Sequence, residues 1–141
     1  MTLEMRDPLP DRPPPARGNV ARPYWEALAE GRFLLQHCEP CDRYQFYPRA
    51  VCTRCGADPE WRESEGRGTV YTFTIIRQNG ARPFSEELPY VVAMIELEEG
   101  VKVMSTVTDI EPDEVTVGMA VQAYAVRADD GVGLLYFTPA R

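Results

Sequence analysis

The chain has a single histidine and a single lysine among its 141 residues, so side chains suited to proton transfer or covalent catalysis are scarce. A nucleophile activated by histidine would have to use His37, which stands next to a cysteine that belongs to a predicted metal-binding motif. A Schiff-base mechanism would depend on Lys102, which lies in an alternating strand pattern and is interpreted as a solvent-facing residue. We therefore expect the chain to be non-catalytic alone.

Long apolar runs and a surplus of basic charge are also missing. No apolar stretch reaches the ~18 residues of a membrane span, and the N-terminus lacks the apolar core of a signal peptide. The chain has 15 basic against 22 acidic residues, for a formal net charge of -7. Nucleic-acid binding is built mainly on a surplus of Lys and Arg. We expect a cytoplasmic protein with no membrane and no nucleic-acid partner.

Residues 1–31 are predicted to form a proline-rich arm and a short helix. Residues 1–18 hold five of the thirteen prolines, which lack the amide donor, so this segment is expected to be extended rather than helix or strand. Pro23 suits a first helical turn and Gly31 suits the position past a helix end. The helix between them carries Tyr24 and Trp25 on one face. These aromatic rings are interpreted as core packing, with contact to a partner chain as the alternative.

Four cysteines form two Cys-x2-Cys pairs separated by ten residues, and they are predicted to be the metal ligands: Cys38, Cys41, Cys52 and Cys55. Each pair can bring two sulfurs to one ion from a tight turn, and four thiolates complete the closed shell that zinc favours. Residues 32–65 are therefore predicted to be a rubredoxin-like zinc ribbon with one structural ion. An iron–sulfur cluster, two disulfides and redox chemistry are the alternatives.

Residues 66–141 change to a period of two and are predicted to form five strands, at about 66–78, 90–97, 101–107, 119–127 and 132–138. Asp129-Asp130-Gly131 is predicted to form the last hairpin turn. One long strand, a hairpin, a spacer and a second hairpin match a five-stranded OB-fold barrel, so the fold class is mainly β. Most of the acidity lies here, because residues 83–141 carry a net charge of -8.

These features together resemble a known family. The resemblance rests on a set of motifs running from about residue 20 to the C-terminus: Tyr24-Trp25, Gly31-Arg32-Phe33, the paired knuckles around Tyr47-Pro48-Arg49, Trp61, and Gly66-Arg67-Gly68-Thr69-Val70-Tyr71-Thr72-Phe73-Thr74. It continues in Pro89-Tyr90-Val91-Val92-Ala93, Gly118-Met119-x-Val121 and Phe137-x-Pro139. The combination is similar to the zinc-ribbon plus OB-fold proteins that accompany thiolase-like enzymes. Zinc ribbons and OB barrels each occur in many unrelated proteins, so only the combination is specific.

The resemblance implies an accessory subunit in acyl-CoA metabolism. A thiolase-like partner would hold the catalytic residues, as a sterol-carrier-type aldolase in steroid degradation or as an acyltransferase. This chain would support the partner and shape the passage of its acyl-CoA substrate. The implied activity of the complex is a lyase reaction, retro-aldol cleavage of a steroid side-chain CoA thioester, or an acyl transfer, both within lipid metabolism.

The candidate binding residues lie outside the cysteine motif. Residues 79–89 form the longest irregular segment of the predicted barrel, and OB barrels commonly bind through the loop after the first strand. Arg82 and Phe84 in this loop, with Tyr24 and Trp25 of the helix, are the candidate contacts for substrate or partner, and an ordinary long loop is the alternative. A nucleic-acid-binding zinc-ribbon/OB module and a stand-alone acyl-CoA-binding protein stay open as other functions.

Overall fold

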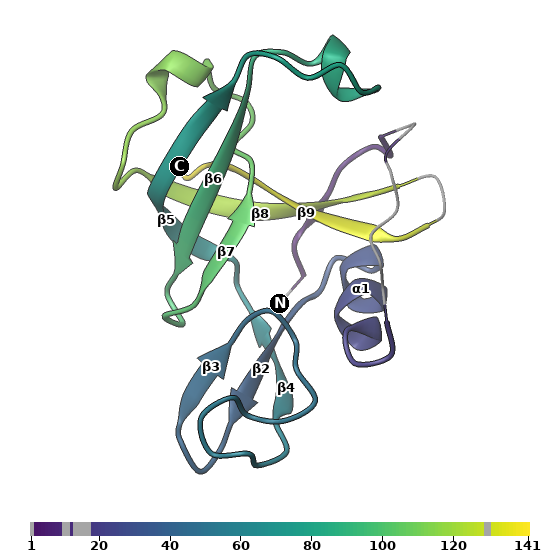
Figure 1. Cartoon of the computed structure of the whole chain (residues 1–141), viewed down its shortest axis with the longest axis vertical. Coiled ribbons are helices and arrows are strands. Elements are labelled where there is room, and N and C mark those ends of the chain that lie inside the picture. Colours follow the sequence, from purple (N-terminus) through teal and green to yellow (C-terminus); the bar gives the residue numbers. More distant parts are fainter. Residues whose placement is uncertain (1, 10–11, 13–17, 129–130) are drawn as a thin grey trace.

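The computed structural model describes residues 2–9, 12, 18–128 and 131–141. Two antiparallel units make up the described chain, a small sheet and a larger barrel, with one helix between them (Figure 1). Most regular structure is β, as the sequence predicts. Among the described residues, no helix is long and apolar enough to cross a membrane.

The small sheet forms the ribbon. Its strand order is β3-β2-β4, with β2 at Phe33–Cys38, β3 at Arg43–Gln45 and β4 at Glu60–Ser64. All six residues of the central strand β2 are buried, and α1 packs against this strand. Strand β4 was absent from the sequence-based prediction. It is short and mostly exposed, so its pattern carries little hydrophobic signal.

The barrel contains the five predicted strands with small shifts at their ends. They are β5 (Arg67–Ile76), β6 (Tyr90–Leu97), β7 (Lys102–Ser105), β8 (Ala120–Arg127) and β9 (Gly133–Pro139). Strand β5 pairs with β6 and β8, β6 pairs with β7, and β8 pairs with β9. A parallel bridge from Val107 to Phe137 joins the segment after β7 to β9. This bridge closes the five strands into the predicted OB-type barrel.

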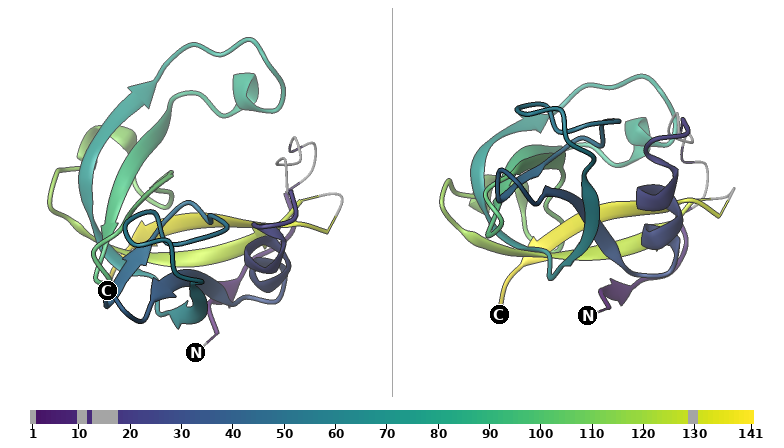
Figure 2. Two further views of the ribbon diagram at one scale, coloured as in Figure 1. Left: turned by 60° about the horizontal axis from the view of Figure 1, so that its bottom comes forward. Right: turned by 90° about the horizontal axis from the view of Figure 1, so that it is seen from below.

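Alternating burial explains the barrel core. In β6 every second residue faces inward, and Ile95 at its centre is fully buried. The connections carry two short 3-10 helices, η1 (Phe84–Glu86) and η2 (Pro112–Glu114), in segments that the sequence left irregular. Of the predicted last turn, Asp129 and Asp130 lie outside the described residues. The 3-10 helix η1 lies in the connection between β5 and β6, beyond the ends of these strands (Figure 2).

The helix α1 (Arg22–Ala29) falls where the sequence places it, with Pro23 in its first turn. It packs on β2, β8 and β9, and Leu28 at its C-terminal end is completely buried. A side chain at Gly133 would overlap the backbone of Leu28 and Ala29, so glycine permits this close approach of helix and strand. The helix thus joins ribbon and barrel through one continuous core.

The N-terminal arm differs from its prediction in one respect. Glu4–Met5 forms the two-residue strand β1, which pairs in parallel with β8, so the expectation of an arm without a strand is wrong here. This stretch has no proline, and its backbone donors are free to pair. The Leu3 amide also donates to the Gly31 carbonyl at 2.6 Å. Four of the five arm prolines, at positions 10, 13, 14 and 15, lie outside the described residues.

Candidate functional site

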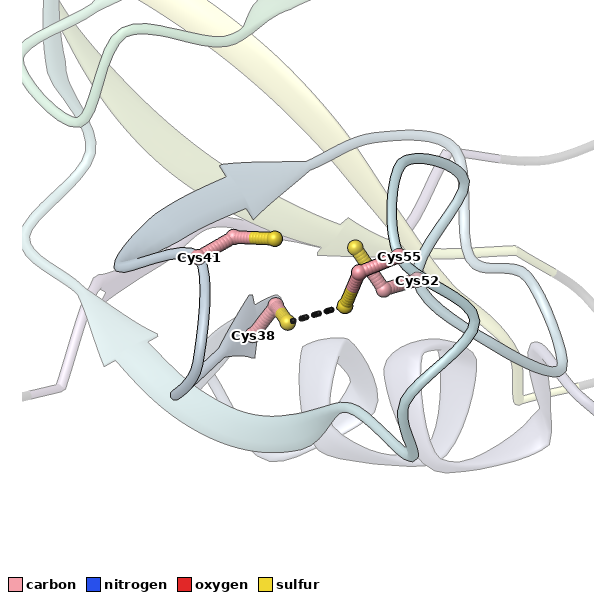
Figure 3. A group of neighbouring side chains, drawn as sticks. All are labelled: Cys38, Cys41, Cys52 and Cys55. Carbon is pink, nitrogen blue, oxygen red and sulfur yellow. Dashed lines mark hydrogen bonds between the residues drawn. The ribbon is translucent and has the colours of Figure 1, made fainter.

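The two Cys-x2-Cys pairs face each other across the tip of the ribbon (Figure 3). Cys38 ends β2 and Cys41 lies in the turn before β3, while Cys52 and Cys55 come from a second turn. All four Sγ atoms lie within 4.8 Å of one another, and Cys38 Sγ is 3.5 Å from Cys55 Sγ. Four thiolates at the ~2.3 Å zinc–sulfur distance stand about 3.8 Å apart in a tetrahedron. The donor set and its spacing therefore fit a zinc ion.

All four thiols are free in the structure. Backbone N–H groups of Cys55 and Arg54 lower the pKa of Cys52 to about 6, because they donate to its thiolate. The pKa of Cys41 is raised to about 12, mainly by a hydrogen bond with Cys55 and secondly by burial. Thiols with such different proton affinities must all lose their protons to ligate one ion, so metal binding here releases protons.

A buried amide pair, missed by the sequence analysis, holds the second cysteine turn against the ribbon. Gln45 Nε2 donates to Gln36 Oε1 at 2.8 Å, and its Oε1 accepts from the backbone N–H of Thr53 at 3.0 Å. Gln36 in turn bonds both backbone groups of Arg49. Two glutamines on separate strands give no sequence signal that they hold a loop in place. Their partners lie on a loop that only the fold brings near.

His37 is buried beside the knuckle and belongs to a different network. Its Nδ1 lies 3.2 Å from Glu60 Oε1, and its Nε2 lies 3.1 Å from Asp42 Oδ1. Together with Glu39, His37 and Glu60 form a second cluster with metal-ligand atoms. Arg62 already forms ion pairs with both glutamates, at 2.8 Å and 2.6 Å, so a cation at this cluster would have to compete with an arginine for their carboxylates.

A cavity of about 770 Å³ lies where α1, the ribbon and the open end of the barrel meet. Figure 2 shows η1 and the ends of β5 and β6 standing across from α1 and the β8–β9 hairpin. The lining is largely apolar, and its aromatic members among the described residues come from six separate segments: Tyr24, Trp25, Phe46, Tyr47, Phe84, Tyr90, Tyr124 and Tyr136. A volume of this size suits a small-molecule ligand, and the apolar walls suit a hydrophobic one.

Three of the four candidate binding residues line this cavity, and one does not. Tyr24 packs edge-on against Phe46, and the Trp25 indole N–H donates to the Tyr47 hydroxyl at 2.9 Å. Phe84 lies on the opposite side, on η1. Arg82 is 83% exposed, pairs with Glu86 at 3.3 Å, and stands outside the lining.

The cavity also contains Arg12, which the sequence analysis did not single out. Its side chain is only 6% exposed and pairs with Glu87 through Nη2 and Oε2 at 2.7 Å. It comes from the arm, where a lone arginine among prolines gives no sign of burial. Tyr124 and Tyr136 also line the cavity, and burial raises the pKa of both, which keeps their hydroxyls protonated.

A four-cysteine zinc ribbon followed by an OB-fold barrel defines the class of this protein. Residues 25–62 match the rubredoxin-like zinc ribbon domain of ChsH2, and residues 61–126 match the ChsH2 C-terminal OB-fold domain. A DUF35 domain-containing scaffold protein of Methanocaldococcus jannaschii is 34% identical over 115 residues, covering 77% of this chain and 81% of that protein. The chain belongs to this ChsH2/DUF35 family, as its sequence resemblance implies.

Two further relatives carry names that mention enzyme complexes. The structure described as "Ltp2-ChsH2(DUF35) aldolase" superposes with a TM-score of 0.83 at 32% identity, covering 91% of this chain and 100% of that one. A probable enoyl-CoA hydratase alpha subunit of Thermomonospora curvata is 33% identical over 130 residues, or 92% of this chain. The present chain spans 40% of the length of that subunit.

Proposed function

We propose that the chain is the accessory subunit of a thiolase-like, acyl-CoA-processing complex, with a partner that holds the catalytic residues. The observation that carries the proposal is the likeness, over 91% of the chain, to a structure described as an Ltp2-ChsH2 aldolase. Two relatives named as hydratase alpha subunits support a role beside an enzyme of acyl-CoA chemistry. The aldolase reaction proposed for the complex is retro-aldol cleavage of a steroid side-chain CoA thioester, and acyl transfer is the alternative.

The chemistry of the described residues supports a helper role. Retro-aldol cleavage needs a general base and a group that stabilises the developing enolate. The cavity walls offer protonated tyrosines and one buried arginine, but the single carboxylate there, Glu87, is already paired with Arg12. The proposed division of labour leaves proton abstraction to the partner. This chain then supports the partner and shapes the substrate passage.

We also propose that Cys38, Cys41, Cys52 and Cys55 hold one structural zinc ion. Four protein ligands leave no open coordination position, so the ion would stabilise the ribbon rather than take part in the reaction. Because four thiolates must stay reduced, a cytoplasmic location is the proposed one. The ribbon wall of the cavity, Phe46 and Tyr47, lies directly beyond β3 and would depend on the ion for its position.

Complex formation tests the proposed function. We expect the tagged chain, expressed in its own host, to retain a thiolase-like protein that mass spectrometry identifies. The purified chain alone should show no turnover of acyl-CoA thioesters, whereas the pair should be active. Isolation of the chain as a monomer with no thiolase-like companion would contradict the proposal, as would turnover by the chain alone.

Residues of the η1 loop provide the matched variants. Phe84→Ala and Arg82→Ala are expected to reduce retention of the partner or activity of the pair by about tenfold, the effect of losing an interface anchor. Arg77→Ala is the control, because this arginine is 62% exposed and pairs only with Asp113 among the described residues. Undiminished complex formation and activity in both loop variants would remove the loop from the interface.

A further inference from the structure

Two aromatic residues of the cavity wall lie between the supports of the ribbon. Phe46 and Tyr47 follow directly after β3 and line the cavity. Gln45, the last residue of β3, precedes them and is buried. After them, the backbone N–H and carbonyl of Arg49 bond to the buried side chain of Gln36 at 2.8 Å and 2.9 Å. The aromatic segment is therefore held at both ends by buried side-chain amides.

Gln45 joins this aromatic segment to the second cysteine turn. Its Oε1 accepts from the backbone N–H of Thr53 at 3.0 Å, and its Nε2 donates to the Val51 carbonyl at 3.2 Å. Val51 and Thr53 flank Cys52, one of the four proposed zinc ligands. A shift of the second cysteine turn would therefore displace Gln45 and, with it, its neighbour Phe46.

The aromatic segment also contacts helix α1. Trp25 Nε1 donates to the Tyr47 hydroxyl at 2.9 Å, and the rings of Tyr24 and Phe46 pack edge-on with their centroids 5.5 Å apart. Helix α1 is in turn anchored to the barrel, because Leu28 is completely buried and the helix packs on β8 and β9. The cavity therefore has one wall from the ribbon and another from α1 and the barrel, and the two walls meet at Tyr47 and Trp25.

The ribbon wall has little regular structure of its own. Strand β3 is three residues long, and residues 46–59 contain no helix or strand. In small metal-binding modules the free energy of metal binding is also free energy of folding. We therefore expect the ribbon wall to be in place only when the four cysteines hold their ion, whereas α1 and the barrel wall do not need it.

We propose that zinc binding and formation of the cavity wall are coupled, with Gln45 transmitting the position of the second cysteine turn to Phe46 and Tyr47. The inference rests on the proposed zinc site and concerns this chain alone. Coupling is reciprocal, so a contact made only by the zinc-bound wall must also strengthen zinc binding. The ion thus acts on the cavity from a distance, because none of the four cysteines is among the lining residues.

Zinc affinity of the full-length chain, measured by competition with the chelator HEDTA, tests the coupling from the cavity side. Tyr47→Phe removes only the hydroxyl that accepts the Trp25 N–H. We expect zinc to bind about fivefold more weakly, which is the net effect of one hydrogen bond. Tyr90→Phe is the matched control, because its hydroxyl accepts from Asn79 Nδ2, also at 2.9 Å, but on β6 of the barrel wall. It should leave zinc affinity unchanged.

Gln45→Met tests the transmitting residue. The substitution keeps the length of the side chain and removes its hydrogen bonds to the cysteine turn, so zinc affinity should fall about tenfold. Adding Tyr47→Phe to this variant should weaken zinc binding no further, because the connection is already lost. Gln122→Met is the control, since this amide donates to the Glu65 carbonyl at 2.7 Å from strand β8.

The indole of Trp25 reports the cavity wall directly. In a chain labelled with 5-fluorotryptophan, the fluorine resonance of Trp25 is assigned with the variant Trp61→Phe. We expect this resonance to shift when the chelator removes zinc and to return when zinc is restored. The shift should be smaller in Tyr47→Phe. Circular dichroism melting confirms that each variant is folded; if Gln45→Met does not fold, the two tyrosine variants and the Trp25 resonance decide.

Three results would overturn the coupling and leave the zinc site in place: unchanged zinc affinity in folded Tyr47→Phe, an equal loss of affinity in Tyr90→Phe, or a Trp25 resonance that does not respond to zinc removal. A chain that binds no zinc would refute the proposed zinc site and the coupling together. The proposed accessory role is tested separately by retention of the partner, and it would stand in each of these cases.

Discussion

At the scale of single residues, the metal motif depends on side chains that are distant in the sequence but close in space. Each Cys-x2-Cys pair is local, so its geometry follows from a tight turn. The buried side-chain amides of Gln36 and Gln45 hold the two cysteine pairs near each other. They form hydrogen bonds to the loop that carries the second pair and so fix it to the ribbon strands. The spacing of the cysteines therefore predicts the ligand set, while the hydrogen bonds that position the ligands depend on the fold.

Loss of one cysteine tests the ligand assignment. We expect Cys52→Ser to reduce zinc from one ion per chain to nearly none and to unfold the ribbon, because in such modules the free energy of metal binding is also free energy of folding. Metal analysis of the purified protein and thermal melting measure the two effects. Val51→Ser is the control, since this neighbour is 44% exposed and offers no thiol. One zinc per chain and an unchanged melting temperature in Cys52→Ser would exclude Cys52 as a ligand.

At the scale of elements, helix α1 is the part that places ribbon, barrel and cavity in contact. Its eight residues are too few for a stable isolated helix, so tertiary packing must hold it. The apolar face buries Tyr24 and Leu28, and the same face supplies one wall of the cavity through Trp25. The alternatives of core packing and ligand contact for these aromatic residues are therefore compatible in one helix.

The close approach of α1 to β9 gives a prediction at this scale. Gly133→Ala would add a methyl group against the backbone of Leu28 and Ala29, and we expect it to lower the free energy of unfolding by about 1–3 kcal/mol. Denaturation in urea measures the difference. Gly80→Ala, where an added methyl group meets nothing, should change stability by less than about 0.5 kcal/mol. Equal changes in the free energy of unfolding for the two substitutions would show that α1 and β9 can move apart without loss of stability.

At the scale of the whole molecule, residues 103 positions apart tie the N-terminal segment to the barrel. Arg6 Nη1 lies 2.7 Å from Asp109 Oδ2, and the guanidinium stacks 3.8 Å from the centroid of Tyr124. A hydrogen bond from Thr138 and the contact with Arg6 hold the pKa of Asp109 below its usual value. This pairing supports the segment that leads to Arg12 and so to the cavity.

The pH dependence of stability tests this connection. Because the pKa of Asp109 is lower in the folded chain than in the unfolded one, its contribution is complete above the unfolded pKa of about 4 and is lost as pH falls through the folded pKa. Asp109→Asn, which tolerates the positive φ at this position, should cost up to about 1 kcal/mol at pH 7, since the pair is half-exposed.

Below about pH 4 the difference in free energy of unfolding between the two proteins should shrink toward zero. Denaturation curves collected from pH 7 down to about pH 3 provide the measurement. Asp113→Asn is the control, because Asp113 is 81% exposed and pairs with Arg77 alone among the described residues. A difference that stays constant over the whole range would show that the charge of Asp109 does not act on folding.

Much of the fold was predictable because its signals are local. The spacing of four cysteines, the proline and glycine that bracket α1, and the alternation of the barrel strands each depend on a few neighbouring residues. The short exposed strand β4 and the pairing of Glu4–Met5 with β8 escaped prediction, because pairing with distant strands stabilises them. The two 3-10 helices escaped it because each is only three residues long. The division at residues 1–31, 32–65 and 66–141 stays a prediction.

By itself, then, the sequence determined the fold class through periodicity along the chain and the family through the resemblance of its motifs, and the spacing of its cysteines predicts the ligand set. Only the tertiary structure decided that Tyr24, Trp25 and Phe84 share one cavity, and that Arg82 remains outside it. It also decided that Arg12 is buried and pairs with Glu87. The physical reason is that burial and hydrogen-bond satisfaction depend on which distant segments meet. No local pattern in the proline-rich arm predicts which distant segments it contacts.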